Sequence, residues 1–296
     1  MARPPTPLPE PLLAGPFGIA RAVELGVGRG RLRHRGLIVP TRGVRTLTSP
    51  RTVADHARAQ ALVLSRPFAF SHLTAAALLG MPLPRRVDQP TEVHVMTTTT
   101  RGQARRSGVV GHRGVERRSV VEVGGLPVVG PVDTWADLAG SVPPDELVVL
   151  GDWLLGQGLR LEQLAQVVHH RETMRGVRSL RAALRLVRPG SASRMETLAR
   201  LMFVRGGLPE PELNADVHDL NGQWILRADF LWRARRVLAE YQGDIHRTDR
   251  QRWQSDVARR RLAEQNGWTV IELTSRELFQ GPAREELLDH LRTLLG

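Results

Sequence analysis

Two short segments near the carboxyl end constrain the fold most, because each places polar side chains on a predicted strand. They are Ala228-Asp229-Phe230 and Leu238-Ala239-Glu240-Tyr241-Gln242-Gly243, separated by an arginine-rich turn. Residues two apart on a strand point to the same face, so Glu240 and Gln242 share one face. If the turn folds Asp229 back beside that face, two carboxylates and an amide oxygen converge. Such ligands suit Mg²⁺ or Mn²⁺, and a metal held there can activate water against a phosphodiester.

The region 191–296 contains further residues in an order that matches a known family. They are Ser193-x-x-Glu196, Asp229, Glu240-Tyr241-Gln242-Gly243, His246, Asp256-x-x-Arg259-Arg260 and Gly267-Trp268-Thr269-Val270. This region resembles the PD-(D/E)XK nuclease superfamily, and within it the Vsr-like (very short patch repair) endonuclease domains. The resemblance implies a helix, three strands, a helix and a strand around a mixed sheet.

The resemblance also implies roles for individual residues in a metal-dependent endonuclease. Asp229 and Glu240 would bind the metal, Glu196 would assist from the first helix, and His246 would contact the scissile phosphate or a water molecule. Gln242 stands where the family usually has lysine, and the sequence contains no lysine at all. At this position the sequence departs from the family's pattern.

Several of these residues also have simpler interpretations. Glu196 follows Ser193 at the spacing of a capping box, in which the glutamate only satisfies a backbone N–H group. Asp256 and Arg260 are four residues apart on a predicted helix, where they could form a surface ion pair. His246 could be an ordinary loop histidine. The sequence leaves each alternative open.

Length and composition restrict the class of protein. A chain of 296 residues with 41% apolar content is long enough for more than one core. The absence of cysteine excludes disulfides and thiolate chemistry. No apolar run approaches the roughly 20 residues that a membrane span needs, and the proline-rich start lacks the order of a signal peptide. We therefore expect a cytoplasmic protein that does not enter a membrane.

The positive charge is concentrated in the first part of the chain. Residues 1–130 contain 19 arginines against 7 acidic residues, whereas residues 131–190 have 7 of each and residues 191–296 have 16 of each. A polyanion, and duplex DNA in particular, is therefore expected to bind the first part; the alternative is a basic surface that serves solubility. The candidate DNA-binding residues are Arg29, Arg31, Arg33, Arg35, Arg42, Arg101, Arg105 and Arg106. Whether the chain is a monomer or a homodimer stays open.

The pattern of elements predicts an α/β protein with several domains. Residues 17–50 combine two small helices, a basic segment and a hairpin, and they resemble the N-terminal winged helix-turn-helix of AbiEi-type antitoxins. The expected divisions are a disordered head at 1–16, the winged helix at 17–50, helices and a small basic sheet at 51–130, a helical connector at 131–190 and the nuclease-like domain at 191–296. A second hypothesis follows: a non-catalytic DNA-binding regulator, related to antitoxins, whose nuclease fold has decayed.

Three histidines lie in the basic region. His72 follows a predicted helix cap and is expected to be a capping or core residue, because no partner falls at ligand spacing. His94 and His112 lie on predicted strands and are expected to face solvent rather than to bind a metal as a pair.

Overall fold

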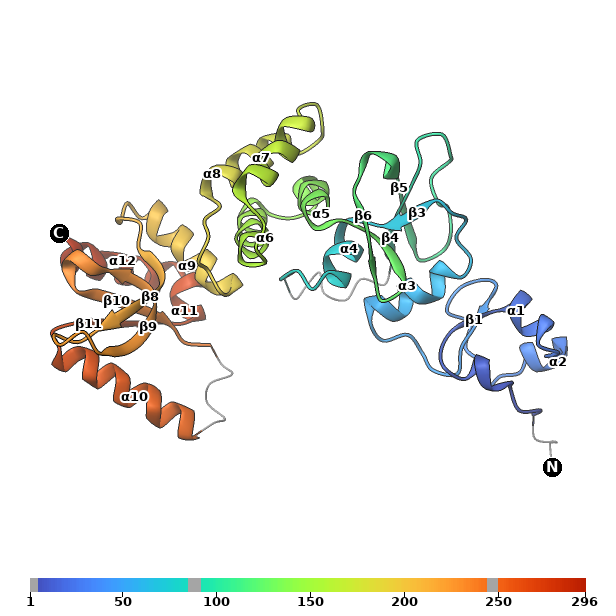
Figure 1. The fold of residues 1–296 in the computed structure, drawn as a ribbon, viewed down its shortest axis with the longest axis horizontal. Helices are drawn as coiled ribbons and strands as arrows, with labels where there is room; N and C mark the ends of the chain where they lie inside the picture. The colour runs from blue at the N-terminus through green and yellow to red at the C-terminus, as the bar shows by residue number, and fades with distance from the viewer. Residues whose placement is uncertain (1–4, 85–91, 244–249) are drawn as a thin grey trace. The chain divides into compact units, whose positions relative to one another are not determined.

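A computed structural model describes residues 5–84, 92–243 and 250–296, with the backbone alone at 250–256. The chain forms two compact units (Figure 1). Unit 1 comprises Met1–Val142 and His170–Gly176, and unit 2 comprises Pro143–His169 and Val177–Gly296. Both units combine helices with sheets of mixed strand direction, so the predicted α/β class is confirmed. Within the described ranges, no helix is both long and apolar enough to cross a membrane.

Unit 1 begins with a small helical region that has its own core. Its elements are the 3-10 helix Glu10–Leu12, β1 (Phe17–Gly18), α1 (Ile19–Glu24), α2 (Arg29–Leu32) and β2 (Val44–Arg45). The expected disordered head is wrong for residues 5–16, because Leu8 and Leu12 are buried in one cluster with Phe17 and Leu32. Among the described residues, the expected hairpin is reduced to a bridge between Ile38 and Thr46. Strand β2 pairs instead with β1.

The rest of unit 1 is a five-stranded sheet with helices. Its strands lie in the order β5-β4-β3-β7-β6. The elements are α3 (Val53–Ala61), β3 (Phe68–Phe70), α4 (His72–Leu78), β4 (Val93–Thr97), β5 (Val109–Arg113), β6 (Val120–Val123), β7 (Leu126–Val129) and α5 (Pro131–Asp137). The sequence patterns did not predict β3, which lies at the centre of the sheet and pairs with β4 and β7.

The expected connector divides between the units. Helix α5 belongs to unit 1, whereas α6 (Pro144–Gly156), α7 (Leu161–His170) and α8 (Val177–Leu186) fall almost entirely in unit 2. Helix α6 packs through buried leucine and valine side chains. It supports α9 (Arg194–Arg205), because Asp152 of α6 accepts hydrogen bonds from Thr197 and Arg200.

The remainder of unit 2 has the order of elements that the resemblance implies. The elements are α9 (Arg194–Arg205), β8 (Glu212–His218), β9 (Trp224–Trp232), β10 (Val237–Tyr241), α10 (Arg250–Gln265), β11 (Thr269–Leu273), α11 (Ser275–Phe279) and α12 (Gly281–Leu295). The sheet order is β11-β10-β9-β8, with β10 and β11 parallel and the other pairs antiparallel. One core cluster joins the sheet to α9, α11 and α12, and another joins it to α10, so helices cover both faces (Figure 1).

Two glycines of α6 provide a test of the packing between α6 and α8. A Cβ at Gly151 would lie 2.3 Å from Cγ2 of Val187, whereas a Cβ at Gly156 would meet nothing within 4 Å. We expect Gly151→Ala to destabilise unit 2 by about 1–3 kcal/mol through overpacking. Gly156→Ala should stabilise it by about 0.5–1 kcal/mol, because alanine loses less backbone entropy. Urea unfolding of both variants measures the difference, and equal effects would contradict the described packing.

Candidate functional site

Asp229 lies at the centre of the candidate site, on β9 beside β10. Its side chain is half-buried, and its Oδ2 accepts a hydrogen bond from the backbone N–H of Tyr241 at 2.8 Å. The antiparallel register pairs Phe230 with Ala239. The described pairing ends at these residues, so Asp229 and Glu240 are the next residues along two neighbouring strands.

Strand β8 reverses its facing next to Asp229. Leu213 packs with the core cluster under α9 and α12, whereas Ala215 packs with the cluster under α10. Residues two apart on a regular strand share a face, so the backbone turns over at Asn214, whose φ is +47°. Asparagine tolerates this left-handed conformation better than most residues. Irregular strands of this kind often occur beside functional sites, where they redirect a side chain.

The side chain of Asn214 connects this irregularity to α9. Its Nδ2 donates to the Glu196 carboxylate at 2.7 Å and to the Gly190 carbonyl at 2.8 Å. The sequence patterns gave Asn214 no predicted role. The available signal was a small polar residue inside a predicted strand, at the position opposite the aspartate.

Glu196 takes part in the start of α9, and its metal-site role stays a prediction. Ser193 caps α9 by accepting from the backbone N–H of Glu196 at 3.2 Å. The return bond of the glutamate runs to the N–H of Ala192 at 2.8 Å, one residue before the cap. Glu196 is buried, and its charge also acts on Asp229. It therefore both fixes the start of α9 and shapes the electrostatics of the site.

The ionised form of Asp229 is disfavoured in this environment. Burial raises the pKa of Asp229 to about 6, the hydrogen bond from Tyr241 acts in the opposite direction, and the nearby Glu196 carboxylate raises the pKa further. Among the described residues, no arginine or histidine forms an ion pair with Asp229. A bound cation would remove this penalty, so the local chemistry suits a divalent ion.

Glu240 has a cationic neighbour. The Nε of Arg260, on α10, lies 3.8 Å from Oε2 of Glu240, and the same guanidinium contacts Glu272. Glu272 is the partner of Glu240 in the parallel β10–β11 register. The interpretation of Arg260 as an ion-pair partner of Asp256 gains no support here, because the Asp256 side chain lies outside the described residues.

The other predicted site residues are placed as follows. Gln242 directly follows β10 and is half-buried, and its backbone N–H donates to the Leu273 carbonyl at 2.8 Å. His246 lies outside the described residues. Within the described chain, the carboxylates of Asp229, Glu240 and Glu196 do not form a group of three with all ligand atoms within 4.8 Å of one another. The carboxylate and amide oxygens of these residues are the kind of ligand that Mg²⁺ prefers. The guanidinium of Arg260 lies near one of them, the Glu240 carboxylate.

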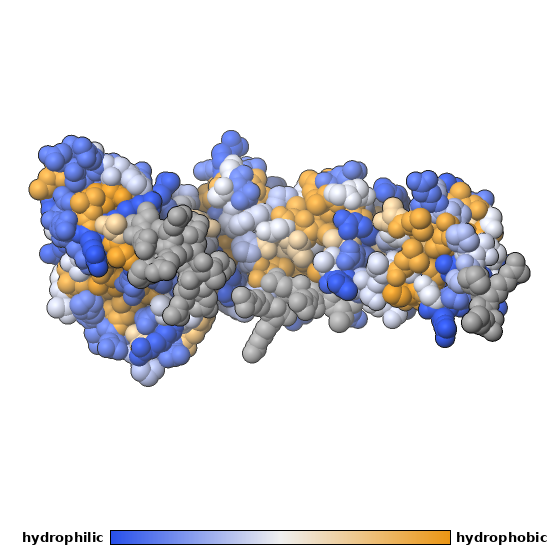
Figure 2. All heavy atoms as spheres, turned by 90° about the horizontal axis from the view of Figure 1, so that it is seen from below, coloured by the Kyte–Doolittle hydropathy of each residue, from blue (hydrophilic) through white to orange (hydrophobic). Residues whose placement is uncertain are grey.

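The candidate DNA-binding arginines of unit 1 differ in their contacts. All are exposed except Arg31 and Arg106, which are half-buried. Arg31, Arg101 and Arg106 donate to the carbonyls of Thr6, Arg66 and Arg42 at 2.7, 2.7 and 2.6 Å. These three side chains therefore connect loops in addition to supplying charge. On the face drawn in Figure 2, hydrophilic residues form several groups among apolar ones.

Comparison with known proteins gives distant relatives. Two proteins of Mycobacterium tuberculosis, from strains CDC 1551 and H37Rv and both named only as uncharacterized, are each 26% identical to this chain over 212 residues. The match covers 71% of this chain and 76% of each relative, so it extends over parts of both units. No protein-family model matches the chain. No solved structure matches it either.

Proposed function

We propose that the protein is a metal-dependent endonuclease in which unit 2 hydrolyses a phosphodiester bond of DNA and the basic residues of unit 1 hold the duplex. The observation that supports this most is Asp229: a half-buried carboxyl on β9 beside Glu196, whose negative charge lacks a described cationic partner. A carboxylate that is costly to ionise without a cation is typical of functional sites.

The residues of the site have distinct roles in this proposal. Asp229 and Glu240 would hold Mg²⁺ or Mn²⁺, and Glu196 would keep the site negative while fixing the start of α9. Gln242 would orient the attacking water through its amide, and His246 would contact the scissile phosphate or that water. The metal, when bound, supplies positive charge to the phosphodiester and lowers the pKa of water.

Arg260 favours a second candidate function. Its guanidinium already places positive charge beside Glu240 and Glu272, so the ion pair can neutralise part of the site without a metal. In that case unit 2 is a non-catalytic platform, and the protein is a DNA-binding regulator related to antitoxins.

A nicking assay on supercoiled plasmid with Mg²⁺ or Mn²⁺ tests the proposal. We expect nicking by the wild-type protein and none by Asp229→Asn or Glu240→Gln, because each substitution replaces a carboxylate that would bind the metal with a neutral amide. Glu212→Gln is the matched control: Glu212 lies on the same sheet and pairs with Arg233 at the surface, so its loss should leave nicking unchanged.

DNA binding is measured in parallel by fluorescence anisotropy at two salt concentrations. Binding should persist in all three variants and weaken as salt rises, because phosphate contacts release counterions. Equal nicking in every variant would rule out the proposed site. Salt-dependent binding without nicking in any protein would favour the regulator.

A further inference from the structure

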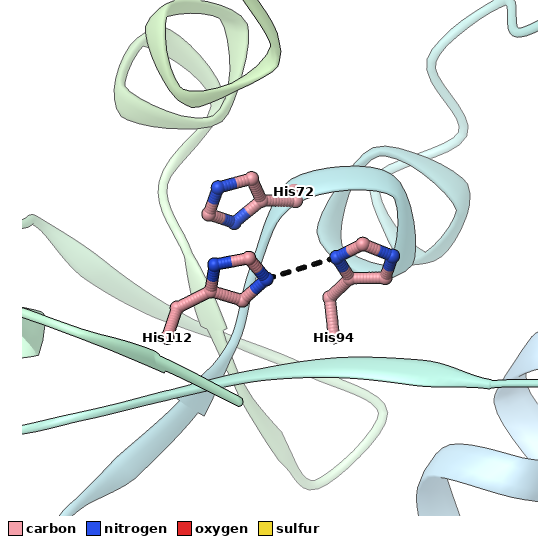
Figure 3. Close-up of side chains that lie close together, drawn as sticks. All are labelled: His72, His94 and His112. Carbon is pink, nitrogen blue, oxygen red and sulfur yellow. Dashed lines mark hydrogen bonds between the residues drawn. The ribbon is translucent and has the colours of Figure 1, made fainter. Parts of the chain in front are cut away.

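Three histidines of unit 1 meet in the structure although they are far apart in the sequence. His72 begins α4, His94 lies on β4 and His112 lies on β5. Each offers a ring nitrogen within 4.8 Å of those of the other two (Figure 3). The expectation that His94 and His112 face solvent is wrong: both are half-buried, with His72 over them. We propose that these three residues, the His72 cluster, bind one divalent transition-metal ion of the Zn²⁺ type.

The register of the sheet explains why the two strand histidines meet. In the parallel β4–β5 pair, His94 is the partner of Val110 and His112 is the partner of Met96. Since residues two apart on a strand share a face, both imidazoles project from the same face of neighbouring strands. Their nitrogens Nδ1 of His94 and Nε2 of His112 point at one another, 3.0 Å apart (Figure 3).

His72 reaches the other two rings through an unusual backbone conformation. Its φ is +49°, in the left-handed region that non-glycine residues seldom occupy. The ring lies over His112, with 3.6 Å between the centroids and 17° between the planes. Ser71 contacts Nδ1 of His72 at 3.1 Å, which fixes the orientation of the ring as second-shell partners of metal-binding histidines do. Strained residues of this kind concentrate at functional sites.

The spacing suits a tetrahedral ion. Metal–nitrogen distances of about 2.0–2.1 Å place the ligand nitrogens about 3.3 Å apart. The nitrogens of one pair are 3.0 Å apart and those of the others at most 4.8 Å apart. The rings would turn out of their stacked arrangement to direct three in-plane lone pairs at one ion. Imidazole nitrogens select ions such as Zn²⁺ over Mg²⁺, which prefers oxygen. Three protein ligands leave the fourth position to water.

The charges around the His72 cluster are balanced. Arg118 and Arg171 act on His72, but both pair with Asp137, and Arg171 also pairs with Asp133. Burial and the neighbouring rings lower the pKa of His72 to about 3 and that of His112 to about 4. The rings are therefore neutral at pH 7, which is the form that has a free nitrogen lone pair.

Zinc binding is tested with metal-free protein that carries no histidine tag. We expect isothermal titration to give one Zn²⁺ per chain for the wild type. His94→Ala and His112→Ala should weaken binding by at least about 100-fold, more than loss of an outer partner usually does. His72→Asn should do the same while keeping a residue that tolerates the left-handed backbone. His56→Asn, on α3 of the same unit, is the control and should bind as the wild type does.

A second measurement needs no variant that might fail to fold. Saturating Zn²⁺ should raise the Tm of the wild type by about 5 °C, and equal Mg²⁺ should not. Asp229→Asn should keep the Zn²⁺ response, which separates this site from the proposed nuclease site. No Zn²⁺ binding by the wild type, or unchanged binding in His94→Ala and His112→Ala, would overturn the proposal and leave a stack of neutral rings joined by one hydrogen bond.

Discussion

Arg200→Met is expected to lower the free energy of unfolding of unit 2 by about 3–5 kcal/mol, because it leaves a buried carboxylate without its cation. Arg200, on α9, donates to Asp152 of α6 at 2.9 Å, and both side chains are only 1% exposed. Arg200 also donates to the Leu186 carbonyl at 2.8 Å. Methionine fills similar space but provides no donor. Burial raises the pKa of Asp152 even in the presence of Arg200. Removal of the Arg200 cation therefore makes the ionised carboxylate still less favourable.

The same two helices provide a matched control. Arg205 of α9 donates to Asp145 of α6 at 2.7 Å, but these side chains are 54% and 36% exposed. Arg205→Met should therefore cost less than about 1 kcal/mol, and less still at high salt. Urea unfolding of the two variants gives the comparison. If Arg200→Met lowers the free energy of unfolding no more than Arg205→Met does, burial does not determine how much each ion pair contributes to stability.

The positions of Asp229 and Glu240 on two neighbouring strands were predictable because they depend on local rules. Alternation along each strand fixes the facing of a side chain, and a short turn makes the two strands neighbours. The contact of Arg260 with Glu240 and Glu272 was not predictable in the same way. It depends on how α10 rotates against the sheet, and α10 is so rich in charged residues that its apolar pattern does not specify one face.

Two features of unit 1 escaped the sequence patterns for a related reason. Strand β3 consists of Phe68, Ala69 and Phe70, which are all buried at the centre of the sheet. Three apolar residues show neither alternation nor helical spacing. The His72 cluster escaped because ligand spacing was sought along the chain, whereas its members come from three elements. A useful signal was present: His94 and His112 lie on adjacent predicted strands, both at positions between inward-facing residues.

Asp229→Asn is expected to stabilise unit 2 at neutral pH while abolishing the proposed nicking. The pKa of Asp229 is raised to about 6 in the folded chain, compared with about 3.9 in an unfolded one. The folded state therefore binds the proton more tightly. The stability from this group is fully present below about pH 4 and is lost as the pH rises to about 6. At pH 7 the loss amounts to about 1–3 kcal/mol, since residual solvent contact reduces the full value of the shift.

Asparagine does not titrate, and its side-chain oxygen can still accept the hydrogen bond from Tyr241. We therefore expect the variant to exceed the wild type in unfolding free energy at pH 7 and the difference to disappear near pH 4. Mg²⁺ should raise the stability of the wild type at pH 7 and leave the variant unchanged, because a cation removes the same penalty as the amide does. Urea titrations at the two pH values, with and without Mg²⁺, measure all these differences. A variant less stable than the wild type at pH 7 would show that the Asp229 charge is already compensated, and the main support for a metal at this site would be lost.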